Sequence, residues 1–514
     1  MPQRSGWSLF TLKNRSLFTK FSAQPFLAQV VCGLLIAIAS LALTSCHSAQ
    51  YYYYKFPAYT FANRPIPPSL LDTRVMVSVS ANGSQGSLQI LDAKRDIRNN
   101  VEDTITSFSI SGYSGGYPST IFNFPEQVHG YVYSDNDGSL SSVDYGKETA
   151  SSSGGASFTP KSTSVAIPSL FTHFYAAEES AGQLLVDDNT TGRTYPLNLP
   201  NVYKVFVNQG DTIALAMVRN SNTIYRILKL NVNQFPTTLQ AIQTIGAVDC
   251  QPYNSPVYCV VPVASPQDPA NMFDRPIGAY FSLDGNSIYI LNCGPECGGT
   301  TASVTVLQPG GLTVDVIPTT PTYPSAFTAQ VLVPGGVTTA VADGTTLYVA
   351  GQQLMPDGLF AGNLSTISLA TNTVTGKYSI SDGFHSKLLF ADDNTLWIGS
   401  QFCANGERAK LGQNYNCLTR FDLGAKTASI VPAVTPGSAT AIVPYPNTNN
   451  DLYYYGNLTG LCWVQNKHKV YTAYGGQVHL FNTADGSEIN NFYVTVQGTA
   501  LDVAYMDAIT NSAN

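Results

Sequence analysis

The stretch that decides the fold is Tyr280-Phe281-Ser282-Leu283-Asp284-Gly285-Asn286-Ser287-Ile288-Tyr289-Ile290-Leu291. It consists of an apolar segment, a tight polar turn and a second apolar segment with a tyrosine near its middle. An Asp-Gly pair supplies the positive φ that a two-residue hairpin turn needs. Closely related patterns recur at 340–349 and 388–398, and weaker copies lie at 205–215 and 463–471. The pattern therefore predicts repeated β-hairpins.

Further strand-like stretches follow each copy, and no long segment after the first fifty residues shows helical periodicity. Strand–turn units of about 40 residues without helices are typical of a β-propeller, whose blades surround a central channel. The expected fold is all-β, a seven-bladed β-propeller. A propeller of six or eight blades remains an alternative, because 111–200 and 433–460 fit the repeat poorly. Innermost strands are expected to begin near Val128, Tyr203, Gly278, Val337, Ser386, Leu461 and Leu501.

The clearest copy also carries a family resemblance. Ser282-Leu283-Asp284-Gly285 followed by Ile288-Tyr289-Ile290-Leu291-Asn292 resembles the S-P-D-G…L-Y-V-x-N core of YVTN-type propeller repeats, a WD40-like group. Leu283 stands where that family usually has proline. The resemblance covers most of 74–508 and is strongest over 278–400. It implies the fold much more than an activity, because such propellers include both binding proteins and enzymes.

The two ends of the repeat region are expected to complete one blade. The first blade, 74–110, lacks an innermost strand of its own, and Leu501-Asp502-Val503-Ala504-Tyr505-Met506 has no strands after it. We therefore expect the C-terminal strand to pair with the N-terminal blade. Such closure removes an open sheet edge that would invite aggregation.

The first 46 residues have the order of an export signal. Four basic residues precede the uncharged apolar run 26–43, and the chain has no acidic residue before Asp72. Leu43-Thr44-Ser45-Cys46 resembles a bacterial lipobox, which implies lipidation of Cys46 and anchoring in the cell envelope. An uncleaved membrane anchor or simple secretion stays open. All three alternatives predict an exported protein.

Composition sets limits on the partners of the exported part. The signal, 1–46, is followed by a Tyr/Pro-rich tether, 47–70, and by a single propeller domain, 71–510. The chain has 26 basic and 33 acidic residues, and 11% of its residues are charged. Loss of the signal's four basic residues takes the formal net charge from −7 to −11. A net acidic surface argues against nucleic-acid binding.

Six of the nine cysteines lie in pairs within long loops, and an oxidising compartment favours disulfides. The expected disulfide cysteines are Cys250 with Cys259, Cys293 with Cys297, and Cys403 with Cys417. Cys462 lies in an apolar strand and is expected to be a buried free thiol. Tetrahedral zinc at Cys293 and Cys297 would need two more ligands, and none is evident, so neither a metal nor another cofactor is predicted.

Long connections are expected to gather on one face of the propeller. In a meandering blade with strands A to D, the A–B and C–D turns share one face, and the B–C and D–A connections share the other. We assign 292–301, 351–363 and 401–416 as B–C loops, and 246–277, 318–336 and 432–459 as D–A connections. Long loops on a rigid scaffold are common binding sites, so this face is the predicted ligand surface.

No catalytic motif stands out. Gly112–Gly116 matches G-x-S-x-G without a following helix, and Asp135–Gly138 matches only part of a calcium loop. We therefore predict an envelope-anchored protein that binds a protein or polysaccharide, with no catalytic residue assigned. The alternative is a propeller enzyme of lactonase, hydrolase or lyase type at the channel mouth. It would require convergence among Asp144, Glu178, Asp249, His129 and His385.

Overall fold

The computed structural model describes the residues 66–96, 109–152, 155–230, 246–251, 256–263, 273–316, 327–356, 358–401, 403, 416–432, 457–489, 494 and 496–514. All of them belong to one compact unit, Gln50–Asn514. The predicted signal with Cys46 and most of the predicted tether lie outside the described residues. Among the residues described, no helix has the length and apolar character needed to cross a bilayer.

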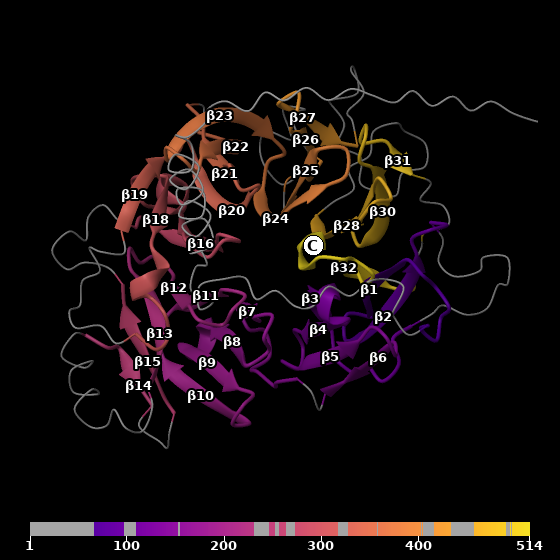
Figure 1. Cartoon of the computed structure of the whole chain (residues 1–514), viewed down its shortest axis with the longest axis horizontal. Coiled ribbons are helices and arrows are strands. Elements are labelled where there is room, and N and C mark those ends of the chain that lie inside the picture. The colour runs from indigo at the N-terminus through magenta and orange to yellow at the C-terminus, as the bar shows by residue number, and fades with distance from the viewer. Residues whose placement is uncertain are drawn as a thin grey trace, which may run out of the picture. The chain divides into compact units, whose positions relative to one another are not determined.

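The strands form eight antiparallel sheets around a central channel, so the protein is an all-β, eight-bladed propeller (Figure 1). Blade 1 contains β1 (Arg74–Ala81), β2 (Gln85–Asp92) and β32 (Thr499–Tyr505); blade 2 contains β3 (Pro118–Phe124), β4 (His129–Ser134), β5 (Leu140–Asp144) and β6 (Thr149–Ser151). Blade 3 contains β7 (Ser164–Ala166), β8 (His173–Glu178), β9 (Gln183–Asp188) and β10 (Arg193–Asn198); blade 4 contains β11 (Val202–Val207), β12 (Ala214–Val218), β13 (Ile224–Leu230), β14 (Asp249–Cys250) and β15 (Val257–Pro262).

The second half of the ring is more regular, with four strands in each blade. Blade 5 contains β16 (Pro276–Phe281), β17 (Ile288–Asn292), β18 (Ser303–Leu307) and β19 (Phe327–Leu332); blade 6 contains β20 (Gly336–Ala342), β21 (Thr346–Leu354), β22 (Phe360–Ser368) and β23 (Thr373–Ile380). Blade 7 contains β24 (Phe384–Ala391), β25 (Thr395–Gln401), β26 (Leu418–Asp422) and β27 (Thr427–Val431); blade 8 contains β28 (Leu458–Val464), β29 (Lys469–Tyr474), β30 (Gln477–Asn482) and β31 (Glu488–Ile489).

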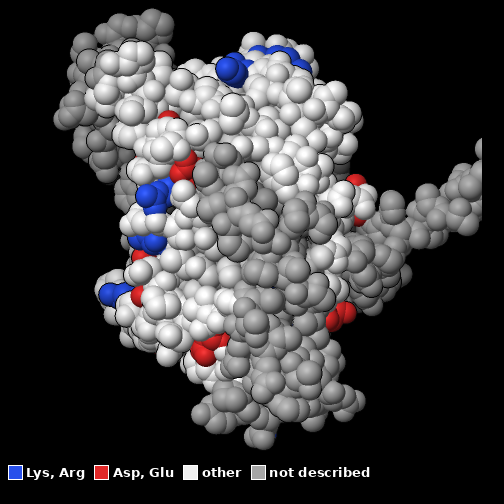
Figure 2. Space-filling model, turned by 90° about the vertical axis from the view of Figure 1, so that its left-hand side faces the viewer, with Lys and Arg blue, Asp and Glu red and all other residues white. Residues whose placement is uncertain are grey.

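The hydrophobic core lies between the blades. Each pair of neighbouring blades shares a cluster of buried apolar side chains, including the pair formed by blade 8 and blade 1. At that last interface Val77 and Val503 of blade 1 pack with Tyr471 and Leu480 of blade 8. Burial of both faces of each sheet explains why apolar residues are frequent and charge is sparse. Figure 2 shows few charged side chains on the described part of the surface in view.

The predicted closure of the ring is confirmed. Strand β32 pairs antiparallel with β1, with Val75 opposite Tyr505 and Val77 opposite Val503. Strand β32 is thus the innermost strand of the blade that starts the domain. The prediction that the last strand completes the first blade rested on the missing inner strand in 74–110, and that observation was sufficient.

The blade count of seven is wrong, and the eighth blade lies within 111–200. Within this poorly fitting part, the stretch 146–165 contains β6 and leads into β7, the three-residue inner strand of blade 3. So short a strand shows no alternation in sequence, and its A–B connection carries Pro168 instead of an Asp-Gly turn. Val128 was also misassigned: it has a positive φ of 55° in the turn after β3.

The assignment of all long connections to one face is wrong for two of them. Strand β19 occupies part of 318–336, so the long connection in blade 5 joins β18 to β19 and is a C–D connection. In blade 4 the segment between β13 and β15 contains β14, which pairs with the outer edge of β15. Residues 249–250 therefore belong to an extra outer strand of blade 4 and not to a D–A connection. The stretches 292–301 and 351–363 join second to third strands as predicted, although β21 and β22 occupy part of 351–363; 401–416 and 432–459 lie mostly outside the described residues.

Candidate ligand-binding site

A β-bulge recurs in the innermost strands, near the point where each strand begins. Seven of the eight blades contain one, and only blade 3 pairs its described inner strand without a register shift. A bulge adds one residue and redirects nearby side chains, and bulges are frequent near binding sites. The extra residues are Ser119, Tyr203, Ile277, Thr338, Ser386, Thr459 and Leu501.

Four of these extra residues, Ser119, Ser386, Thr459 and Leu501, line a cavity of about 610 Å³ within the channel, and Lys204, next to the bulge of blade 4, lines it too. That volume lies in the ordinary range for small-molecule sites. Because the lining residues come from the first halves of the inner strands, the cavity lies toward the face that carries the B–C and D–A connections. Its hydroxyl-bearing lining residues are Tyr117, Ser119, Thr120, Tyr133, Ser162, Thr163, Ser164, Ser386 and Thr459, and its charged ones are Asp135, Lys204, Lys387 and Asp502.

A second cavity of about 300 Å³ continues the channel toward the A–B face and shares Phe122, Ser386 and Lys387 with the first. Asn514 lines it, donates a hydrogen bond to the Val503 carbonyl at 3.2 Å, and accepts one from Asn123 at 2.7 Å. The last residues of the chain thus lie against the inner strands at the centre of the ring (Figure 1).

Two of the charged residues that line the main cavity, Lys387 and Asp502, form an ion pair with each other. Lys387 Nζ lies 3.0 Å from Asp502 Oδ1, and Asp502 also accepts the Ile121 N–H at 2.9 Å. The pair bridges blades 7 and 1 across blade 8, whose equivalent position is Gly460. A Cβ on Gly460 would lie 2.7 Å from Asp502 Oδ1, so the absence of a side chain there makes room for the pair.

Lys204 has no such partner. Among the described residues, none forms a hydrogen bond or ion pair with its amine. Burial, assisted by the positive charge of nearby Arg219, lowers the pKa of Lys204. Arg219 itself is paired with Glu179 and lies over the ring of Tyr203. The hydroxyl oxygen of Ser386 is a second buried cavity atom without a hydrogen-bond partner in the described structure.

The wall formed by blades 2 and 3 holds carboxylic acids behind or beside the hydroxyls. Ser162 Oγ lies 2.6 Å from Glu178 Oε1 and 3.0 Å from the Thr159 carbonyl oxygen, and its backbone N–H donates to the Tyr133 hydroxyl. Burial raises the pKa of Glu178. Burial also raises the pKa of Asp135, which accepts a hydrogen bond from Ser119 at 2.9 Å.

The residues proposed from sequence for an enzymatic channel mouth do not converge. His129 and Asp144 are opposite each other in blade 2, but neither lines the cavity; His129 contacts Ser142 and Asp144 pairs with Lys147. Asp249 accepts the Asn198 N–H at the outer edge of blade 4. His385 is fully buried, and its burial lowers its pKa to about 4.

Six of the described cysteines form disulfide bonds. Disulfides join Cys250 to Cys259, Cys293 to Cys297 and Cys403 to Cys417, as predicted, and Cys462 is a buried free thiol. Within the described part of the chain, no group of three His, Cys, Asp or Glu side chains is arranged to hold a metal ion.

The sequence interpretation missed the cavity residues Lys204, Lys387 and Asp502. A usable signal was present, because each is a charged residue inside an otherwise apolar inner strand, as in Val202-Tyr203-Lys204-Val205-Phe206. Charge at such a position is costly unless the side chain faces a polar space. Reading the inner strands for this exception would have pointed to the channel.

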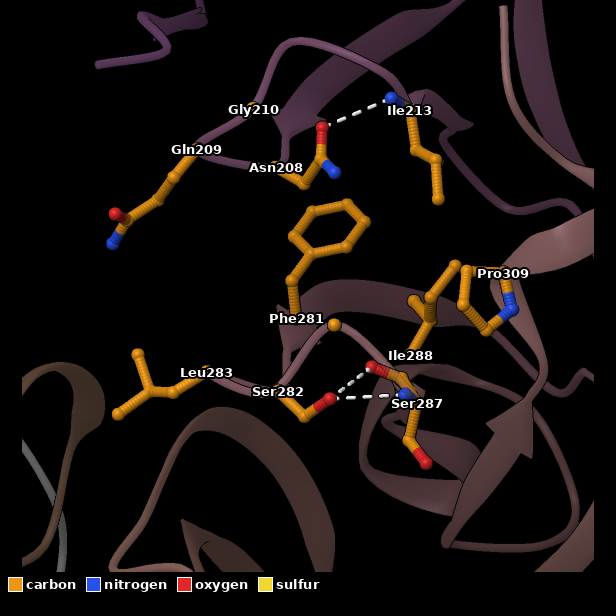
Figure 3. A pocket seen from close by; sticks show the side chains of 11 residues that line it. Asn208, Gln209, Gly210, Ile213, Phe281, Ser282, Leu283, Ser287, Ile288 and Pro309 are labelled. Atoms are coloured by element: carbon orange, nitrogen blue, oxygen red, sulfur yellow. Dashed lines mark hydrogen bonds between the residues drawn. The ribbon is translucent and has the colours of Figure 1, made fainter. Parts of the chain in front are cut away.

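A much smaller pocket, of about 30 Å³, lies between the A–B turns of blades 4 and 5 (Figure 3). The Phe281 ring lies between Asn208 and Ile288 there. Asn208 Oδ1 accepts the Ile213 N–H, and the Ser282 hydroxyl bonds to the Ser287 backbone. These polar atoms form hydrogen bonds within their own turns, so the pocket results from the packing of neighbouring hairpins.

Comparison with known proteins identifies no family. No family model matches the chain, and no curated protein matches it. Among solved structures, the chain is similar to the dihydro-heme d1 dehydrogenase NirN, with 12% identity, TM-score 0.49, and coverage of 88% of this chain and 83% of that one. It is also similar to a periplasmic gluconolactonase of Pseudomonas aeruginosa, with 12% identity, TM-score 0.42, and coverage of 84% and 98%. AztD of Citrobacter koseri has 9% identity, TM-score 0.41, and coverage of 84% and 97%.

Proposed function

We propose that this protein is an exported, lipid-anchored binding protein whose propeller holds part of a glycan in the central cavity. The observation that carries the proposal is the cavity of about 610 Å³, whose wall combines many hydroxyl groups with aromatic side chains. Hydroxyls both donate and accept hydrogen bonds, which suits the hydroxyls of a sugar. Tyr117, Phe122 and Tyr133 add apolar ring surface for the sugar's C–H groups.

The position of the cavity also supports a glycan ligand. It lies toward the face of the B–C and D–A connections, which is the face that sequence reasoning selected for binding. A ligand that enters there meets the Lys204 amine, which has no hydrogen-bond or ion-pair partner among the described residues. A buried polar group without a partner costs free energy, and a ligand that supplies the partner recovers it.

The test is to screen the purified full-length chain against an array of glycans and to measure binding of each hit by calorimetry. Thr459→Trp places a bulky side chain in the cavity, whereas Thr373→Trp places one on the exposed edge of β23. We expect only Thr459→Trp to abolish binding. Equal binding by both variants would contradict the proposal.

Export and anchoring are tested separately. When the chain is expressed in bacteria supplied with radiolabelled palmitate, we expect the wild type and Cys32→Ala to be labelled. Cys46→Ala should carry no label. Labelling of Cys46→Ala at the wild-type level would overturn the lipid anchor. It would leave the glycan proposal unaffected.

A second candidate function is ester hydrolysis, and the contact of Ser162 with Glu178 favours it. Glu178 would take the hydroxyl proton while Ser162 Oγ attacks an ester carbonyl, and the leaving alcohol would take that proton, which leaves the acyl group on Ser162. Water would then attack this acyl group, with Glu178 taking a proton from the water and returning it to Ser162 Oγ as the acid leaves. A raised pKa makes Glu178 a stronger base than an ordinary carboxylate. The test is labelling by a fluorophosphonate: attachment at Ser162, lost in Glu178→Gln, would favour hydrolysis, and no labelling would remove it.

A further inference from the structure

We infer that the glycan ligand carries a carboxylate, as a uronic acid does, and that Lys204 is the residue that recognises it. This inference rests on the proposed function, because it names the class of sugar that the central cavity takes. The argument depends on three properties of the cavity: its charge balance, the environment of Lys204 and the hydroxyls around it.

The charge balance leaves the Lys204 amine uncompensated. Lys387 and Asp502 form an ion pair at 3.0 Å, so they contribute no net charge. Asp135 is the other acidic residue of the wall; it bonds to Ser119 and lies near Lys161, and burial favours its neutral form. No described acidic group contacts Lys204, so an anion from outside the chain is the partner that its charge lacks.

The neighbours of Lys204 keep its amine available. The nearest charged group that acts on it is Arg219, a like charge that is held away by its own pairing with Glu179. No described carboxylate therefore competes with an incoming anion. A carboxylate that reaches Lys204 would form a charge-assisted hydrogen bond in a partly dehydrated site, where such bonds are strong.

The hydroxyls around the cavity fit the rest of such a ligand. Thr163, Ser164 and Thr459 line the same cavity as Lys204. A uronic acid presents a carboxylate and several hydroxyls on one small ring. Its neutral counterpart differs only by a CH₂OH in place of the carboxylate, which provides a matched pair of probes.

The experiment compares methyl β-D-glucuronide with methyl β-D-glucoside. The full-length chain is reductively methylated with ¹³C-formaldehyde, which keeps lysine charges and gives each lysine an NMR signal; the Lys204→Arg spectrum identifies that of Lys204. We expect the glucuronide to bind at least about tenfold more tightly than the glucoside and to shift the Lys204 signal. Lys204→Met should lose the preference, and Lys377→Met, on the exposed edge of β23, should keep it.

Each of three other outcomes would overturn the inference that Lys204 recognises a carboxylate. If both glycosides bind equally and the Lys204 signal stays in place, the carboxylate inference is overturned and the glycan proposal stands. If Lys204→Met retains the preference for the glucuronide, another group recognises the acid and the inference is overturned. If neither glycoside binds at millimolar concentration and no lysine signal moves, both the glycan proposal and the inference fail.

Discussion

The guanidinium group of Arg74 donates two hydrogen bonds to the carboxylate of Asp507, from Nη2 to Oδ1 at 2.7 Å and from Nε to Oδ2 at 3.0 Å. The two residues are 433 positions apart in sequence, and both side chains are only 3% exposed. Arg74 also contacts Glu148 at 2.8 Å. The buried Arg74 side chain therefore connects three parts of the chain: the start of blade 1, the turn before β6 in blade 2, and the residues after β32. These contacts lie beside the strand pairing that closes the ring.

We predict that Asp507→Asn destabilises the propeller by about 1.5–3 kcal/mol, because it removes the charge-assisted hydrogen bonds from Arg74 to Asp507 while Arg74 keeps its ion pair with Glu148. The measurement is the midpoint of urea unfolding. Lys94→Ala is the matched control: it removes the exposed pair of Lys94 with Asp72 and should cost less than about 1 kcal/mol. Equal unfolding midpoints for Asp507→Asn and the wild type would show that the Arg74–Asp507 ion pair contributes nothing to the stability of the closed ring.

How far the sequence predicted the structure depended on the length of each strand. Blades 5 to 7 have inner and second strands of five to nine residues with polar turns between them, so apolar periodicity revealed them. Blade 3 escaped detection because β7 has three residues, and its pairing with β8 is set by contacts that are distant in sequence. The disulfides followed from loop positions. The charged residues of the inner strands indicated the channel, but the shape of the cavity depends on β-bulges, which no local sequence pattern predicts.

A second prediction concerns acid stability. Although burial alone would raise it, hydrogen bonds from Thr190 and Tyr258 and the charge of Lys229 lower the pKa of Asp188 to about 2, below its usual 3.8. A carboxyl with a lowered pKa stabilises the fold above its unfolded-state pKa, and that contribution is lost as the pH falls toward 2. We therefore expect the urea midpoint to fall between about pH 4 and pH 2.

The Tyr258→Phe variant tests the cause. It removes the 2.7 Å hydrogen bond to Asp188, so the pKa of Asp188 should rise and the loss of stability should begin at a higher pH. Tyr225→Phe, on the neighbouring strand β13, should retain the wild-type profile. Superimposable profiles for all three proteins would mean that this hydrogen bond does not hold the Asp188 pKa down.

A third prediction concerns the glycine in the inner strand of blade 8. Gly460→Ala should cost about 1–3 kcal/mol, because its Cβ would lie 2.7 Å from both Asp502 Oδ1 and the Val503 backbone nitrogen, so the Lys387–Asp502 pair and strand β32 must both shift. Gly424→Ala is the control, since its Cβ would meet nothing closer than 3.4 Å. The measurement is thermal unfolding of both variants. A Gly460→Ala variant as stable as the control would show that the pair has room to move.

A fourth prediction concerns the disulfide of blade 7. Cys403 and Cys417 are both buried and close the base of the B–C connection, with Cα atoms 5.3 Å apart. Replacing both by alanine should lower the free energy of unfolding by roughly 3 kcal/mol, from the loop-closure entropy of about 15 residues. Urea unfolding under oxidising conditions measures it. Under reducing conditions the variant and the wild type should differ much less, and a difference that persisted there would argue for lost packing instead.

The most direct test of the account is a crystal structure of the protein with methyl β-D-glucuronide. We predict that the sugar lies in the central cavity, with its carboxylate within hydrogen-bond distance of the Lys204 amine. Density for the sugar on the A–B turns or on the outer strands, with the cavity filled only by water, would contradict it.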